Sequence, residues 1–140
     1  MSAVFLDSVY LIALEFAHDQ HHAAALAHWT KFAASNRSVV TTSFILDEVV
    51  THLNARGHHG RAVKIGQQLL ASPRGEFVDI DRALLDAGWS YFVRHDDKRF
   101  SLTDCVSFVV MEQRGLRQAL TFDRHFVQAG YECLPTSDGA

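Results

Sequence analysis

The hydrophobic pattern of the chain begins with an unbroken apolar run. Residues 3–6 (Ala-Val-Phe-Leu) contain no polar position, and Asp7 follows them directly. A continuous apolar run of this kind is typical of a strand that is buried on both faces, in the centre of a parallel sheet. Open α/β sheets bind their ligands beyond the carboxyl ends of the strands. Asp7 is therefore expected either at a functional site or as the N-cap of the following helix, since aspartate is a favoured capping residue.

Strand and helix patterns alternate along the rest of the chain. Period-3.6 patterns predict helices over residues 9–16, 20–34, 42–56, 61–71, 82–93 and 101–114, and a short turn or helix over 123–126. Short β-branched or apolar runs predict further strands over 38–41, 76–80, 119–121 and 131–134. Strands separated by helices imply a parallel sheet with right-handed crossovers and helices on both faces. The predicted fold class is therefore α/β.

Composition limits the class of protein. With 140 residues, 48% hydrophobic residues and two prolines, the chain is expected to form one domain over residues 1–135, followed by a frayed tail over 136–140. No apolar segment approaches the roughly 18 residues of a membrane span. Two cysteines without metal-type spacing favour a reduced, cytoplasmic protein with no membrane partner. The net charge of −3 means that nucleic-acid binding would depend on local basic patches.

Acidic residues recur at equivalent places in the predicted elements. Asp7, Asp104 and Asp123 each lie at a strand–helix junction or in a first helical turn, and Glu48 lies in the helix after the second strand. In a doubly wound sheet these places converge above the carboxyl ends of the central strands. Four carboxylates there would suit a hard divalent cation, Mg²⁺ or Mn²⁺. Such sites catalyse phosphodiester hydrolysis by activating water and stabilising charge on the phosphate.

Each acid also has a purely structural interpretation. Ser101 and Asp104 fit a capping box, which would satisfy helix donors without a metal. Asp123 could cap its own short turn. Glu48 and Asp47 lie at opposite margins of the apolar stripe of their helix, and periodicity does not choose between them.

Four segments in order resemble those of PIN-domain proteins, most closely the VapC-like ribonuclease toxins of toxin–antitoxin pairs. The segments are Val4-Phe5-Leu6-Asp7-Ser8, residues 42–50 (TSFILDEVV), residues 101–105 (SLTDC) and residues 120–126 (LTFDRHF). Each motif is weak alone, but four in order across nearly the whole chain are fairly specific. The resemblance implies a three-layer α/β/α PIN-like fold with a parallel sheet of about five strands.

The resemblance also implies a set of functional residues. The catalytic acids of the family match Asp7, Glu48, Asp104 and Asp123. The glutamate followed by apolar residues selects Glu48 over Asp47. Ser8 and Thr121 match the supporting hydroxyl residues of the family. By this resemblance Asp7 and Asp104 bind the metal ion, and Glu48 and Asp123 complete the site directly or through water.

The implied function is a Mg²⁺- or Mn²⁺-dependent endoribonuclease that hydrolyses RNA phosphodiester bonds, the toxin of a toxin–antitoxin pair. Its implied partners are RNA, a cognate antitoxin and a second copy of the chain in a homodimer. Candidate RNA contacts are Arg94, Lys98, Arg99 and Arg124, which flank the acids in the sequence. Basic groups there would attract backbone phosphate. The alternative is that they form a solvated charged loop.

Other interpretations compete with a nuclease. An aspartate-nucleophile phosphatase also begins with a strand that ends in Asp, but it generally needs a second Asp where this chain has Val9. A PIN-like module that binds RNA or a partner without cleavage is a further alternative.

Histidine and aromatic patterns leave further choices open. His18 and His22, with Glu15, have the spacing of a metal site, but no matching motif occurs on another helix, so solvated histidines are favoured. Trp29 and Phe32 are expected in the core rather than in a groove for a partner helix.

Overall fold

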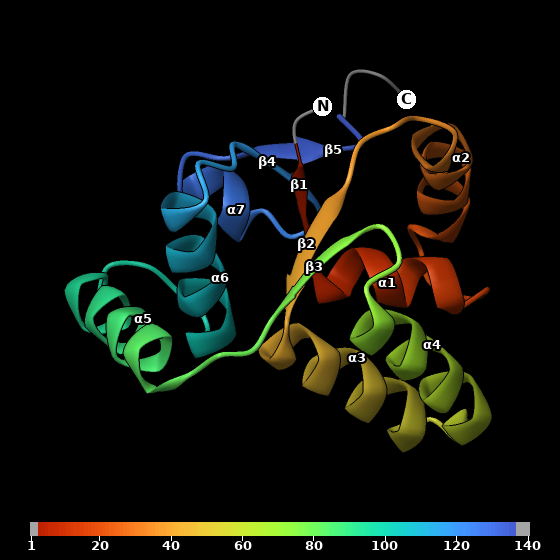
Figure 1. Ribbon diagram of the computed structural model, residues 1–140, viewed down its shortest axis with the longest axis horizontal. Coiled ribbons are helices and arrows are strands. Elements are labelled where there is room, and N and C mark those ends of the chain that lie inside the picture. Colours follow the sequence, from red (N-terminus) through yellow and green to blue (C-terminus); the bar gives the residue numbers. More distant parts are fainter. Residues whose placement is uncertain (1–2, 137–140) are drawn as a thin grey trace.

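A five-stranded parallel sheet forms the centre of the computed structural model, which describes residues 3–136 (Figure 1). Its strands are β1 (Val4–Leu6), β2 (Val39–Thr42), β3 (Gly75–Val78), β4 (Gln118–Leu120) and β5 (Glu132–Leu134). Each predicted strand is confirmed to within a few residues. The predicted fraying of the tail lies outside the described residues, except at Thr136.

The first strand occupies the middle of the sheet, as its apolar run predicted. The strand order is β3-β2-β1-β4-β5, and all three residues of β1 are buried. Val4 pairs with Val39 of β2, and Leu6 pairs with Leu120 of β4. The chain builds outward from β1 to β3 and then returns to add β4 and β5 on the other side. The direction in which successive strands are added to the sheet therefore reverses at β1.

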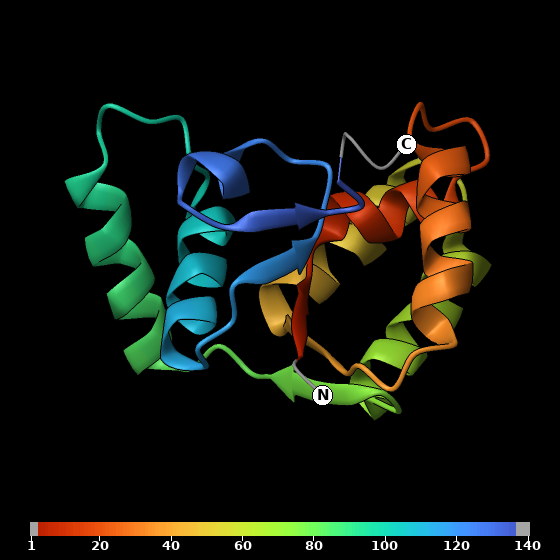
Figure 2. The same ribbon diagram turned by 90° about the horizontal axis from the view of Figure 1, so that it is seen from above.

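Helices cover both faces of the sheet, as predicted. They are α1 (Ser8–Glu15), α2 (His22–Ala33), α3 (Ser43–Ala55), α4 (His59–Ala71), α5 (Arg82–Arg94), α6 (Leu102–Gln113) and α7 (His125–Gln128). Figures 1 and 2 show α1 to α4 on one side of the sheet and α5, α6 and α7 on the other. The short segment after β4 is a helix, α7. Between residues 3 and 136, no helix has the length and apolar character that crossing a membrane requires.

Two aromatic residues of α2 belong to the packed interior. Phe32 is buried, and Trp29 is half-buried against the core with the two rings stacked at 5.7 Å. The guanidinium of Arg74 lies over both rings and donates hydrogen bonds to the carbonyl of Ala33, the last residue of α2, and to those of Ser35 and Arg37 after it. The core interpretation of these residues therefore agrees with the structure.

Candidate functional site

The acids approach one another where the strand order reverses. Asp7 directly follows β1, and Asp123 lies three residues beyond the end of the neighbouring strand β4. Asp104 comes from the first turn of α6, the helix that precedes β4. The crevice beside such a reversal is the usual ligand site of open parallel sheets, because the loops from neighbouring strands diverge there.

Asp7 is buried and does not cap its helix. Although it occupies the N-cap position of α1, its side chain makes no capping hydrogen bond. Instead, Thr121 Oγ1 donates a hydrogen bond of 2.7 Å to Asp7 Oδ2. The pKa of Asp7 is raised to about 7, chiefly by burial; the charges of Asp104 and Asp123 contribute to the rise, and the hydrogen bond from Thr121 opposes it. The carboxylate therefore lies in a site where negative charge is already concentrated.

Asp104 belongs both to the capping box of α6 and to the group formed by Asp7, Asp104 and Asp123, which we call the acid cluster. Ser101 Oγ accepts from the backbone N–H of Asp104, and Asp104 Oδ2 accepts from the backbone N–H of Ser101, both at 3.0 Å. The predicted capping box is thus present. The same Oδ2 lies 2.8 Å from Nδ1 of His125. Burial, more than the charge of Asp123, raises the pKa of Asp104.

Asp123 is tied to Asp7 through a shared hydroxyl. Thr121 Oγ1, which donates to Asp7, accepts a 2.9 Å hydrogen bond from the backbone N–H of Asp123. Asp123 Oδ1 in turn accepts from the backbone N–H of His125 at 2.9 Å. The predicted role of Asp123 in organising its own turn therefore agrees with the structure, and Thr121 positions two acids together.

Glu48 reaches the cluster through Ser8. It is half-buried on α3, and its Oε1 accepts a 2.7 Å hydrogen bond from Ser8 Oγ, the residue next to Asp7. Asp47 is exposed and accepts a hydrogen bond from Thr51 on its own helix. Of the two acids on α3, Glu48 therefore faces the site and Asp47 faces the solvent.

His125 belongs to the site, although the sequence patterns gave it no role. Its Nδ1 lies 2.8 Å from Asp104 Oδ2 and 3.4 Å from Asp123 Oδ1. The side chains of Asp104, Asp123 and His125 each offer an atom that could bind a metal ion, and these atoms lie close together. Among residues 3–136, no lysine or arginine makes an ion pair with any of the four acids. A signal was present, since His125 stands two residues after the last acid.

Part of the predicted basic set borders this group. Lys98 and Arg99 line a hollow of about 470 Å³ together with Asp97, His125 and Gln128. Lys98 is also paired with Asp97 at 3.0 Å. Away from this lining, Arg94 lies over the ring of Tyr91, and Arg124 is exposed beside Asp123.

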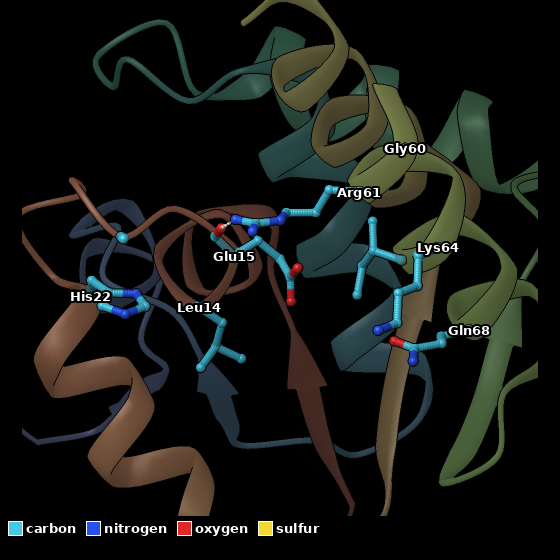
Figure 3. Close-up of a pocket in the computed structure, with 9 residues that line it drawn as sticks. Leu14, Glu15, His22, Gly60, Arg61, Lys64 and Gln68 are labelled. Atoms are coloured by element: carbon cyan, nitrogen blue, oxygen red, sulfur yellow. Dashed lines mark hydrogen bonds between the residues drawn. The ribbon is translucent and has the colours of Figure 1, made fainter. Parts of the chain in front are cut away.

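A larger hollow, of about 630 Å³, lies at the opposite end of α1 from Asp7. Figure 3 shows His22 and Leu14 on one side of it, Lys64 and Gln68 of α4 on the other, and Arg61 reaching the backbone carbonyl of Glu15. None of the four acids lines it. Size alone therefore does not identify the functional site; the grouping of ionisable side chains does.

The remaining histidine candidates do not form a metal site. His18 is exposed, and His22 Nδ1 lies 2.7 Å from the carbonyl of Ala13. His58 packs edge-on against Phe16, while His59 is exposed and bonds Asn54. Within the part of the chain that the structure describes, none of them belongs to a group of three metal-type ligands. His22 is nevertheless half-buried and not solvated as expected.

Comparison with known proteins identifies the family. The model of the PIN domain family matches residues 4–130 of the chain. The 23S rRNA-specific endonuclease VapC20 of Mycobacterium tuberculosis is 34% identical over 129 residues, which cover 91% of this chain and 95% of that protein. The crystal structure of that VapC20, described as a sarcin–ricin loop cleaving toxin, has a TM-score of 0.82 at 32% identity, again covering 91% and 95%.

VapBC2 from Rickettsia felis, solved with a DNA fragment from its promoter, has a TM-score of 0.59 at 13% identity over 95% of this chain and 97% of that one. At that identity it supports the fold alone. The PIN-domain match, over residues 4–130, includes all four acids. The chain therefore belongs to the PIN domain family and is a homologue of the VapC-type ribonuclease toxins.

Proposed function

We propose that this protein is a metal-dependent endoribonuclease whose divalent ion, Mg²⁺ or Mn²⁺, is held by Asp7, Glu48, Asp104 and Asp123. The observation that carries the proposal is the grouping of Asp7, Asp104 and Asp123 at the reversal of strand order, where burial, and to a smaller extent the charges of Asp104 and Asp123, raise the pKa of Asp7. Among residues 3–136 no lysine or arginine neutralises them by an ion pair. A divalent cation suits such an oxygen-rich, negatively charged set of donors.

Each residue has a distinct part in this proposal. Asp7 and Asp104 bind the ion directly, and Glu48 and Asp123 bind it directly or through water. Ser8 holds the carboxylate of Glu48, and Thr121 holds that of Asp7. When bound, the ion supplies Lewis-acid stabilisation of the phosphate charge and lowers the pKa of water.

In this proposal the RNA backbone contacts the basic residues that lie beside the acids. Lys98 and Arg99 line a hollow that His125 shares with the acid group, so a phosphate held there is adjacent to the acids. Arg94 and Arg124 extend the contact on either side. Because the whole chain carries a net charge of −3, this contact is local.

We infer the substrate and partner from the relatives. VapC20 is a 23S rRNA-specific endonuclease described as cleaving the sarcin–ricin loop, and an RNA stem-loop of that kind is our proposed substrate. A cognate antitoxin completes the proposed toxin–antitoxin system, because VapC20 is described as a toxin and the sequence resembles the toxins of such pairs. We place this system in the cytoplasm. Its toxin would be a homodimer, in which each copy contributes one domain formed by residues 1–135.

The test uses the full chain purified free of antitoxin. It should cleave a sarcin–ricin loop RNA in Mn²⁺ or Mg²⁺, EDTA should stop cleavage, and Asp7→Asn or Asp104→Asn should lower the rate at least ~100-fold, equivalent to about 2.7 kcal/mol of transition-state stabilisation. Full activity of Asp7→Asn would contradict the proposed site. RNA binding without cleavage in either metal would instead favour a non-catalytic module.

A matched pair on one helix tests the fourth acid. Glu48→Gln keeps the shape and a hydrogen-bond acceptor for Ser8 but removes the charge, so cleavage should fall strongly. Asp47→Asn removes the same charge from the neighbouring exposed residue and should leave the rate unchanged. Equal losses in the two variants would show that general charge, rather than the position of Glu48, matters.

A further inference from the structure

The imidazole of His125 is held in a fixed position between two acids. Its backbone N–H donates to Asp123 Oδ1 at 2.9 Å, while its ring stands edge-on to the buried ring of Phe100 at 5.6 Å. Nδ1 thereby faces Asp104 Oδ2 at 2.8 Å and Asp123 Oδ1 at 3.4 Å. The backbone N–H of Ser101 fixes that same oxygen of Asp104. The positions of all three atoms are therefore set by the ends of α6 and α7.

The spacing of these atoms suits a shared ligand. One ligand atom from each of Asp104, Asp123 and His125 lies within 4.8 Å of the other two. Adjacent ligands of an octahedral ion with bonds of about 2.1 Å are about 3.0 Å apart. The two spacings from Nδ1, 2.8 and 3.4 Å, fall on either side of that value. An ionised carboxylate only accepts hydrogen bonds, so the 2.8 Å approach of Nδ1 to Asp104 Oδ2 requires either a proton on Nδ1 or a cation bound by both atoms.

We propose that Nδ1 of His125 is a direct ligand of the divalent ion, and that it gives the site a preference for Mn²⁺ over Mg²⁺. The proposal rests on the proposed metal-dependent function and adds a nitrogen donor to its all-oxygen site. Imidazole is a better ligand for first-row transition metals than for Mg²⁺, which is bound almost entirely by oxygen, and Mn²⁺ belongs to that series although it also binds carboxylates well. Replacing His125 with an oxygen donor should therefore weaken Mn²⁺ binding far more than Mg²⁺ binding.

The experiment measures metal binding rather than cleavage. Mn²⁺ is titrated into the metal-free full chain, free ion is followed by EPR, and electron spin-echo modulation detects nitrogen bound to Mn²⁺. Wild type should show coupling to ¹⁴N, which becomes ¹⁵N coupling when the protein is labelled with ¹⁵N-histidine. His125→Gln should lose the coupling and bind Mn²⁺ at least about tenfold more weakly, since replacing even the hydrogen-bonding partner of a metal ligand typically costs about 10–100-fold. Its Mg²⁺ affinity, from competition, should change much less.

His59→Gln is the matched control, because His59 is exposed and contacts Asn54 rather than the acids. It should keep both the coupling and the affinity. Mn²⁺ bound to wild type without histidine coupling would overturn the inference and leave the proposed function intact. Equal losses of Mn²⁺ and Mg²⁺ in His125→Gln would reduce His125 to a positioning residue and also overturn it. Failure of wild type to bind either metal would reject the proposed function itself. The isotope-labelled wild type gives a decision even if the variant does not fold.

Discussion

At the scale of single residues, an aspartate at a helix start has two roles that the sequence does not separate. Asp104 completes the capping box of α6 and contacts His125 with the same oxygen, whereas Asp7 makes no capping bond and accepts a hydrogen bond from Thr121 instead. The difference depends on which donor the neighbouring strand offers, and this becomes visible only after β1 and β4 pair. The place of His125 was likewise hidden, because its contact with Asp104 depends on how α6 and α7 pack.

Asp7→Asn should change how the stability of the metal-free protein depends on pH. The folded-state pKa of about 7 lies above the ordinary 3.8, so the folded state binds more protons between these values. The free energy of unfolding of wild type should therefore fall as pH rises from about 4 to about 7, by up to about 4 kcal/mol. Asp7→Asn keeps an acceptor for Thr121 and should lack this loss, so above about pH 7 it should be the more stable protein.

Urea unfolding in EDTA on both sides of this pH range measures the effect. Asp47→Asn, which alters an exposed carboxylate, should follow the wild-type curve. The interpretation is wrong if Asp7→Asn is less stable than wild type near pH 8, as loss of a favourable charge at the start of α1 would require.

At the scale of elements, the sequence predicted every strand and helix, with boundaries displaced by a few residues. Periodicity and turn residues carry that information locally, so it survives without tertiary structure. The sequence did not predict how closely helices approach one another. Gly88 of α5 is buried against α6, and a Cβ added there would lie 2.5 Å from Val106 Cγ2 and 3.1 Å from Val106 Cα. A residue that looks like a weak helix former is thus required by packing.

Gly88→Ala should destabilise the protein by about 1–3 kcal/mol, because the backbone of α6 cannot move away without disturbing the core. Gly66→Ala on α4 is the matched change, since its Cβ would meet only ordinary contacts at 3.5 and 3.6 Å. That variant should gain up to about 1 kcal/mol from the better helix propensity of alanine. Chemical denaturation of both measures the difference, and a stable Gly88→Ala would refute the close α5–α6 packing.

The capping box of α6 gives a second prediction at this scale. Ser101→Ala should cost about 1 kcal/mol of stability and also weaken Mn²⁺ binding, because the box fixes the oxygen of Asp104 that faces His125. Asp81→Ala removes a comparable cap, the 2.9 Å bond to the N–H of Leu84 on α5, away from the acids. It should lower stability by a similar amount and leave metal affinity unchanged. Thermal melts and Mn²⁺ titrations of both variants separate the two effects.

At the scale of the whole molecule, strand order decides which residues meet. The alternation of strands and helices predicted a parallel sheet, and the continuous apolar run predicted that β1 is central. The order β3-β2-β1-β4-β5, which brings the ends of β1 and β4 together, needed the folded structure or the resemblance to PIN domains. The loop before α6 similarly carries Lys98 and Arg99 to His125, a contact between segments more than twenty residues apart that no local pattern contains.

RNA binding should therefore depend on the local charge beside the acids and not on the net charge of −3. With Asp7→Asn as an inert background and Mg²⁺ held constant, changing both Lys98 and Arg99 to Ala should weaken binding of the stem-loop. The slope of log affinity against log salt concentration should become shallower by about 1.5, since each lost phosphate contact removes about 0.7–0.9.

Changing both Arg61 and Lys64 to Ala removes the same charge from the hollow at the far end of α1 (Figure 3) and should leave the slope unchanged. Binding measured by fluorescence anisotropy at several salt concentrations compares the two double variants directly. If both flatten the slope equally, RNA responds to the overall field of the protein, and the contact does not lie beside His125. If only the Lys98 and Arg99 pair flattens it, the RNA phosphates lie at the hollow that adjoins the acid cluster.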